Sequence, residues 1–462
     1  MSGGQPPLNI TFGVELEWVC VYKQECFEFP DPSTGRAGRA IEAAEEITNR
    51  LKAKGIAALD SLEAADLRTA TGDPTLLYQY WKVHTDDTVG LTSEEKKEVP
   101  AKHRTDAMEI SSRKLSLTGD NWQAELQKVL DTLQEIEDGG ARNITNKNSA
   151  LHIHVGDSTA TIPLRTAKNV CQIITAFTSI FDSMAIATTA DRVQTTPEAP
   201  HDAVPTYNVS PGWYHRHTPR IPSDRTGNVF DWLKTIEDFT MPSEFENVYD
   251  IPDPRFPANV RPIVTGHNGS YNFENLSKPP KGDRTSPLTG TIEFRQHEGT
   301  LDFTAIRHWI VFTTSLVSFC HDADDKTMME LLCHSVDPAY RLADLLPRLC
   351  KDASVVSYYL QRGNAGTLTE TIRTNDHLLP LCRESARPRR LSKTPQRMRA
   401  AIVKRQDAGL YGLNDRANSI AVGSLSALQA RLFLRYRANL QNVLNRQAAR
   451  LQAGPVTDEY DN

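Results

Sequence analysis

Three segments of the chain share one alternation of side chains, and this alternation constrains the fold more than any other feature. Residues 12–19 read Phe-Gly-Val-Glu-Leu-Glu-Trp-Val, residues 151–156 read Leu-His-Ile-His-Val-Gly, and residues 289–301 contain Glu-Phe-Arg-Gln-His. On a β-strand, side chains two residues apart point to the same face. Each segment is therefore predicted to be a strand with one polar face and one apolar face.

The polar faces of these strands carry titratable groups in pairs. Glu15 and Glu17 share a face, about 6.6 Å apart at ~3.3 Å per residue, and repel each other unless a positive group lies between them. His152 and His154 share a face of the second segment. The third segment is expected to place three such groups on one face, namely Glu293, Arg295 and His297. One pair alone would indicate a solvated strand, but three pairs backed by apolar residues predict a sheet with one ligand-rich surface.

In this order, the three segments resemble the putative amidoligase family, over about residues 8–320. That family belongs to the carboxylate–amine ligase superfamily of glutamine synthetase and γ-glutamylcysteine synthetase. The resemblance implies a glutamine synthetase-like α+β fold. Its sheet would be mostly antiparallel, with one polar, ligand-rich face and helices packed on the other, and a helical C-terminal region would follow.

The resemblance also implies roles for individual residues. It assigns metal binding to four carboxylates, namely Glu15, Glu17, Glu109 and Glu293. His154 would be a further metal ligand, and His152 or His154 would contact the metal or the nucleotide. Arg295 would contact a phosphate of the nucleotide, and with Glu293 it would take part in catalysis.

The residue types agree with these roles on chemical grounds. Carboxylate oxygens suit Mg²⁺ or Mn²⁺. An imidazole can complete an Mn²⁺ site or, when protonated, donate to a phosphate, and a guanidinium offers a fork for phosphate oxygens. The sequence has no GxxxxGK[ST] loop and no GxGxxG after a strand. ATP is therefore expected from the resemblance alone.

Shorter patterns predict the remaining elements. Strands are expected at 78–86, 107–112 and 271–276, and helices at 41–54, 121–137, 163–187, 303–320, 327–334, 340–350, 353–361 and 425–451. Asp86 ends the first of these strands. It is interpreted either as a metal-site carboxylate or as a turn-capping residue, and both interpretations stay open.

The expected domain organisation is a catalytic domain at 1–320, with a proline-rich insertion at 191–265 and a helical region at 321–462 packed on it. Such an insertion is usually a functional lid or a disordered segment. An aromatic and basic cluster at 213–217 favours a lid over the polar face, with simple packing as the alternative. The basic run at 383–405 indicates a solvated surface, with contact to an acidic partner as the alternative.

Composition excludes several classes of function. The net charge of −6 and a pI near 6.1 predict no nucleic-acid partner. Seven cysteines without a CxxC spacing predict no disulfide framework. The N-terminus lacks the pattern of a secretion signal, and no run of eighteen apolar residues occurs, so no membrane association is expected. A cytoplasmic location follows as the expectation.

The expected activity is ATP- and Mg²⁺-dependent joining of a small-molecule carboxylate to an amine through an acyl phosphate. A glutamate-like amino acid or peptide, or a precursor in small-molecule biosynthesis, would be the substrate. Two alternatives remain open. One is a metal-dependent amide hydrolase or transferase that does not use ATP, and the other is a non-catalytic binding protein. The sequence also leaves open whether the chain forms a homo-oligomer.

Overall fold

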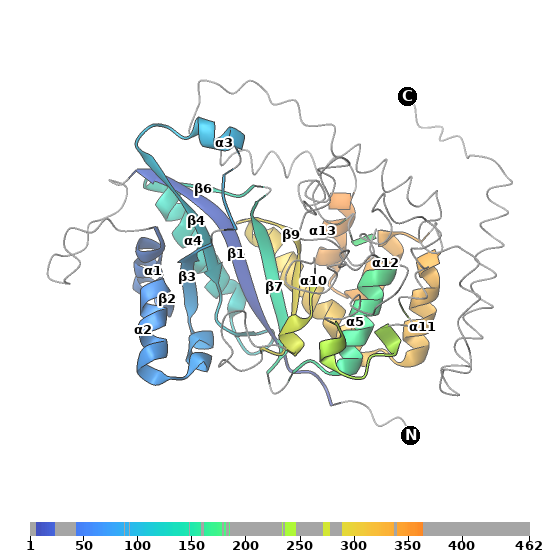
Figure 1. Ribbon diagram of the computed structural model, residues 1–462. Coiled ribbons are helices and arrows are strands. Elements are labelled where there is room, and N and C mark those ends of the chain that lie inside the picture. Colours follow the sequence, from blue (N-terminus) through green and yellow to red (C-terminus); the bar gives the residue numbers. More distant parts are fainter. Residues whose placement is uncertain are drawn as a thin grey trace, which may run out of the picture.

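A computed structural model gives the structure of the chain (Figure 1). It describes residues 6–23, 43–86, 88–91, 93–146, 148–158, 161–177, 180, 181, 184, 233, 236–245, 271–277, 289–336 and 340–363. The predicted cluster at 213–217, the basic run at 383–405 and the helix at 425–451 lie outside these residues. Most of the predicted insertion at 191–265 lies outside them too.

Within the described residues, nine strands form one sheet, in the order β2-β3-β4-β1-β7-β9-β8, with β5 and β6 also paired to β1. The strands are β1 Ile10–Lys23, β2 Ala58–Asp60, β3 Trp81–Thr85, β4 His103–Ser111, β5 Leu115–Ser116, β6 Arg142–Ile144, β7 Ala150–Asp157, β8 Tyr271–Asn272 and β9 Ile292–Glu298. All neighbours are antiparallel except β2 and β3, which are parallel. The prediction of an α+β fold with a mostly antiparallel sheet is confirmed.

The three segments with polar alternation become β1, β7 and β9, which lie side by side in the middle of the sheet (Figure 1). Their apolar side chains are fully buried, as the exposed fractions of Leu16, Ile153 and Phe294 show, each at 0%. The periodicity of two therefore sorts the residues of these strands onto a core face and a ligand-rich face.

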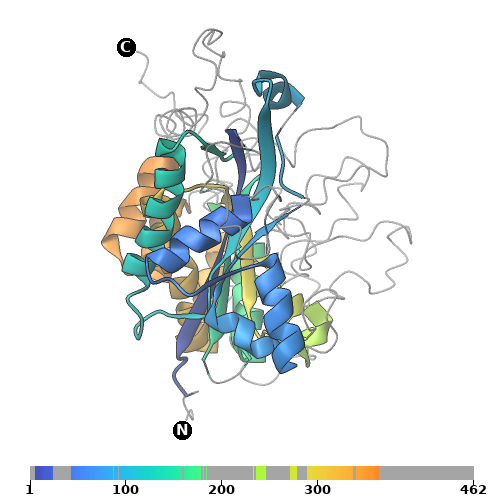
Figure 2. The ribbon, with the colours of Figure 1, turned by 90° about the vertical axis from the view of Figure 1, so that its left-hand side faces the viewer.

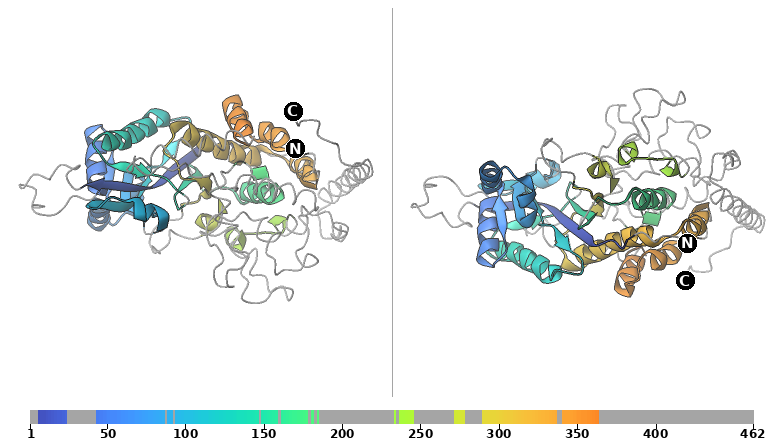
Figure 3. Two further views of the ribbon diagram at one scale, coloured as in Figure 1. Left: turned by 90° about the horizontal axis from the view of Figure 1, so that it is seen from above. Right: turned by 90° about the horizontal axis from the view of Figure 1, so that it is seen from below.

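Helices cover the core face. Helix α4 (Trp122–Asp138) and helix α10 (Phe303–Asp322) lie along one side of the sheet, as the view from above shows (Figure 3). The ring of Trp122 meets Phe12 of β1 edge-on at 5.3 Å between ring centroids. Helix α1 (Ala43–Ala53) packs against α4 and β3. Helix α2 (Ser61–Thr71) packs near β2, and α3 (Ser93–Glu98) lies beside the start of β4, at the top of Figure 2.

Helix α10 is also the centre of a helical layer. Helix α5 (Leu164–Ala176), α12 (Leu342–Leu349) and α13 (Ala353–Gly363) all contact it, and α11 (Asp325–Cys333) contacts α5. Among the described helices, only α10 has the length and apolar composition that a membrane span would need, and 61% of that window is buried inside the protein. It fills the position of a core helix.

Some predicted boundaries were wrong. Helix α5 ends at Ala176, so the helix predicted at 163–187 is interrupted at residue 177; residues 180 and 181 are helical again, and most of 178–187 lies outside the described residues. A short 3₁₀ helix, Pro74–Gln79, replaces the first residues of the strand predicted at 78–86, because Asp73 caps it and Pro74 favours a first turn. The strand predicted at 271–276 ends after Asn272 and continues as a 3₁₀ turn, Glu274–Leu276.

Candidate metal centre

Strand register brings the predicted ligands together in rows across the sheet. Glu17 of β1 lies opposite Glu109 of β4, and Glu109 lies opposite His84 of β3. One row further along, Glu15 lies opposite His152 of β7. Antiparallel partners on one face have their Cβ atoms about 4.5–5.5 Å apart. Residues distant in sequence therefore face one another without any special loop.

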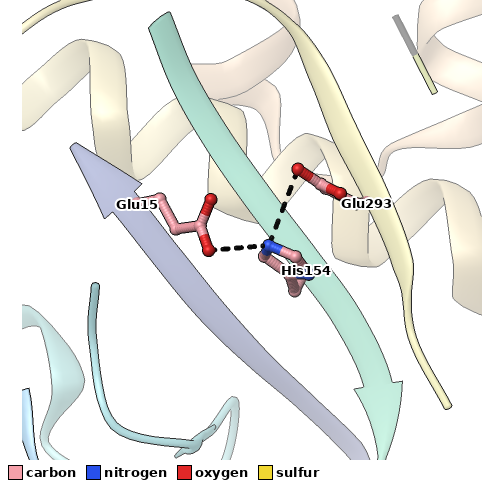
Figure 4. Close-up of side chains that lie close together, drawn as sticks. All are labelled: Glu15, His154 and Glu293. Carbon is pink, nitrogen blue, oxygen red and sulfur yellow. Dashed lines mark ion pairs between the residues drawn. The ribbon is translucent and has the colours of Figure 1, made fainter. Parts of the chain in front are cut away.

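The first cluster joins the three central strands. Glu15, His154 and Glu293 each offer a ligand atom, and these atoms lie within 4.8 Å of one another. His154 Nε2 lies 3.1 Å from Glu15 Oε1 and 3.8 Å from Glu293 Oε1 (Figure 4). Glu293 is nearly buried, whereas Glu15 keeps 25% of its side-chain surface exposed. The cluster is therefore open to solvent on the side of Glu15.

The second cluster lies beside the first on the same face. Glu17, Asp86 and Glu109 also bring ligand oxygens within 4.8 Å of one another. Asp86 in addition accepts hydrogen bonds of 2.8 Å from the backbone N–H and the hydroxyl of Thr88. The turn-capping interpretation of Asp86 is confirmed. The same turn brings its carboxylate close to the other two, as the metal-site interpretation requires. Glu17 is held in place through Oε2, which accepts a 2.7 Å hydrogen bond from the backbone N–H of Ala150.

His152 lies between the two clusters. Its Nδ1 is 3.1 Å from Glu15 Oε2, and its Nε2 is 3.5 Å from Glu17 Oε1. The side chain is only 2% exposed. This imidazole lies between the two carboxylates that the sequence places on neighbouring same-face positions of β1 and contacts both of them.

Two further side chains hold Glu293. Arg295 Nη1 forms an ion pair with Glu293 Oε1. Asn272 Nδ2 donates a 2.7 Å hydrogen bond to Glu293 Oε2. Sequence reasoning left Asn272 without a role, and it also missed His84, whose Nε2 lies 3.3 Å from Glu109 Oε1. The alternation of Lys82 and His84 along 81–85 was the signal that could have found His84.

The electrostatics of the first cluster show a site that attracts cations. Burial alone would raise the pKa of Glu15, but the charge of His154 and hydrogen bonds to His152 and His154 hold it well below its usual value. Burial would likewise raise the pKa of Glu293, and the charges of Arg295 and His154 lower it instead. Burial would lower the pKa of His154, yet the two carboxylates raise it to about 9. In the absence of a metal, His154 therefore carries a proton at neutral pH.

The second cluster behaves differently. Burial and the like charge of Glu109 raise the pKa of Glu17, although His152 opposes this shift. Burial would lower the pKa of His84, and its contact with Glu109 raises it instead. A buried carboxylate such as Glu17, with another carboxylate beside it, is stabilised by a cation placed between them.

The donor set fits a divalent metal. Three carboxylates surround one position and two carboxylates with an imidazole surround the other, as Mg²⁺ or Mn²⁺ prefers. His154 Nε2 is a buried atom that lies between two carboxylates, 3.1 Å from Glu15 Oε1 and 3.8 Å from Glu293 Oε1. A nitrogen directed at a shared position, and not at one acceptor, is suited to ligation. Glu15, His154 and Glu293 would hold one ion, and Glu17, Asp86 and Glu109 a second.

The prediction for His297 was wrong. Leu151 and Ile153 of β7 are paired with His297 and Phe294 of β9, so β9 carries one extra residue between these pairs. Such a β-bulge breaks the alternation of faces. His297 therefore turns to the core side, where its ring lies 5.2 Å from that of Trp309 of α10.

Comparison with known families matches part of the chain. The family described as putative amidoligase enzyme has a model that matches residues 8–196. Over these residues the chain is similar to that family. The name of the family denotes enzymes that form amide bonds. A comparison with curated proteins found no match to the chain.

The family match ends before two members of the predicted site. It includes Glu15, Glu17, Glu109 and both histidines, but not the strand with Glu293 and Arg295. The predicted resemblance extended to about residue 320. In the structure, β9 pairs with β7 and places Glu293 opposite His154. The strand beyond the match thus completes the cluster formed by residues within it.

Proposed function

We propose that the chain is an ATP- and Mg²⁺-dependent carboxylate–amine ligase with a glutamine synthetase-like fold. The observation that carries this proposal is the pair of carboxylate clusters on one sheet face, joined by His152 and flanked by Arg295. Two adjacent divalent ions and a guanidinium are what phosphoryl transfer requires. The substrates would be a small-molecule carboxylate, such as a glutamate-like compound, and an amine.

In the proposed reaction, an oxygen of the substrate carboxylate attacks the γ-phosphorus of ATP, and the bond to ADP breaks. The amine nitrogen then attacks the acyl carbon of the resulting acyl phosphate, the carbon–oxygen bond to phosphate breaks, and the amine loses a proton to solvent. Mg²⁺, when bound, neutralises charge on the phosphates. No covalent intermediate on the protein is needed.

In this reaction, side chains of the protein would position the ion and the nucleotide and would balance their charges. Glu15, His154 and Glu293 would fix one ion against the central strands, while Asn272 sets the orientation of Glu293. Arg295 would donate to a phosphate oxygen, where a planar fork gives both charge and direction. The remaining parts of the proposal are a cytoplasmic location and no nucleic-acid or membrane partner.

Calorimetric titration with a non-hydrolysable ATP analogue, with and without Mg²⁺, tests this function. We expect the analogue to bind only when Mg²⁺ is present. Glu15→Gln and Arg295→Ala should each weaken this binding at least about tenfold, since each removes one charged contact. Glu330→Gln, on the exposed side of α11, is the matched control and should bind as the wild type does.

Three outcomes separate the candidate functions. The ligase is supported if nucleotide binding depends on Mg²⁺ and if ADP and phosphate are released only when both co-substrates are present. Metal binding without nucleotide binding would favour an amide hydrolase or transferase that uses the same carboxylates. Binding of neither would leave a non-catalytic protein.

A further inference from the structure

The contact between Arg295 and Glu293 has a consequence for metal binding. We propose that Arg295 occupies the metal-facing oxygen of Glu293 in the metal-free protein, and that a divalent ion must displace it. The ion's identity rests on the function proposed above. Arg295 would then act as a resident counter-cation that exchanges its partner, from Glu293 to a phosphate group, when the metal enters.

The two oxygens of Glu293 have different surroundings. Oε2 is held by the neutral amide of Asn272 at 2.7 Å. Oε1 faces the cluster, because it is the oxygen that lies 3.8 Å from both His152 Nδ1 and His154 Nε2. Arg295 Nη1 contacts this same Oε1. The guanidinium therefore lies on the one oxygen of Glu293 that an ion in the first cluster would use.

A purely structural role for this ion pair is the alternative. An arginine can orient a carboxylate ligand from behind, as many hydrogen-bond donors around metal ligands do. Here Asn272 already does so on Oε2, and as an uncharged donor it can stay when the ion binds. Arg295 is 8% exposed, so its charge is poorly screened by water. A divalent ion and a guanidinium on the same oxygen would repel each other strongly.

Displacement of Arg295 would couple the metal to the nucleotide. The charges of Glu15 and Glu17 also act on Arg295, but an ion in each cluster would neutralise them. A buried guanidinium that leaves Glu293 is then stabilised by a new anionic partner. A phosphate oxygen of the nucleotide meets that need. Each ligand would then favour binding of the other, since coupling between two sites is reciprocal.

Titration of the nucleotide-free protein with Mn²⁺ tests the proposal. We expect Arg295→Met, which keeps an unbranched stem and removes the charge, to bind Mn²⁺ about tenfold or more tightly than the wild type. Arg295→Lys keeps the charge and should bind within about threefold of the wild type. Equal or weaker Mn²⁺ binding by Arg295→Met would overturn the displacement and leave Arg295 as a positioning residue. Loss of Mn²⁺ binding in all three proteins would instead refute the metal centre and the proposed function with it.

A second measurement uses the wild-type protein and does not depend on a variant that folds. Phenylglyoxal modifies accessible arginines, and the modified positions can be read by peptide mass spectrometry. Mn²⁺ should speed modification of Arg295 several-fold. Arg113, which pairs with Glu125 and Asp120 away from the clusters, is the matched internal control and should not change. Slower modification of Arg295 with Mn²⁺ would contradict the proposal.

Discussion

His154 takes its properties from the two carboxylates that face it. Glu15 and Glu293 stand on the strands to either side, and their combined charge outweighs the effect of burial on the imidazole. A proton on His154 thus occupies the position that a metal would take. The same geometry that makes the residue basic in the metal-free protein makes it a ligand when an ion replaces the proton.

The proton on His154 predicts that the stability of the metal-free protein depends on pH. The folded pKa of His154, about 9, lies above the ordinary value near 6.5. Its contribution to stability is therefore fully present below pH about 6.5 and is lost as the pH rises toward 9. Thermal denaturation of the metal-free wild type should show this loss of stability. The metal-free His154→Gln variant should not show it.

Metal affinity should follow the opposite trend. Because the ion competes with the proton, Mn²⁺ binding to the wild type should tighten with rising pH up to about 9 and release a proton. Calorimetry in buffers of different ionisation enthalpy counts that proton. If no proton were released near pH 7, His154 would not be the displaced acid.

At the scale of elements, much of the site could be predicted from sequence. The spacing of Glu15 and Glu17, and of His152 and His154, places each pair on the polar face because alternation is a property of the extended backbone. His297 could not be predicted, since one extra residue in β9 reverses its direction and no local signal marks that bulge. Which strands are neighbours depends on long-range pairing, and this is also why Asn272 was left without a role.

The turn after β8 supports the site through aromatic packing. Phe245 stacks on Phe273 with ring centroids 4.9 Å apart, and Phe273 directly follows Asn272, the residue that holds Glu293. Both rings are fully buried. A segment that lies within the predicted insertion therefore packs under a residue that orients a metal ligand.

Phe245→Ala should therefore weaken metal binding as well as stability. We expect a loss of about 3–5 kcal/mol in the free energy of unfolding, as is usual for a buried phenylalanine, and Mn²⁺ binding several-fold weaker. Phe181→Ala is the matched control, because Phe181 is equally buried but packs on Phe312 of α10. It should lose similar stability and keep its Mn²⁺ affinity. Equal metal affinity in both variants would show that the stack serves packing alone.

At the scale of the whole molecule, the site is built from both sides of a long sequence interval. Residues 8–196 match the family and supply β1, β4 and β7, whereas β9 and α10 come after residue 289. These later elements provide Glu293 and cover the apolar face of β7, where Leu151 and Ile153 are fully buried. A chain that ended at 196 would expose that face and leave β7 as an unpaired edge.

Residues 1–196 alone should therefore fail to fold cooperatively. Calorimetry should show no sharp unfolding transition, because burial of the sheet's core face supplies the main driving force for folding. Addition of a separate chain of residues 271–363, which includes Asn272, should restore the transition together with Mn²⁺ binding at the first cluster. The same chain carrying Glu293→Gln should restore the transition but bind one Mn²⁺ ion fewer, because the second cluster lies within residues 1–196. If residues 1–196 folded and bound two Mn²⁺ ions unaided, the first cluster would not need β9, and its ion would be held by β1 and β7 alone.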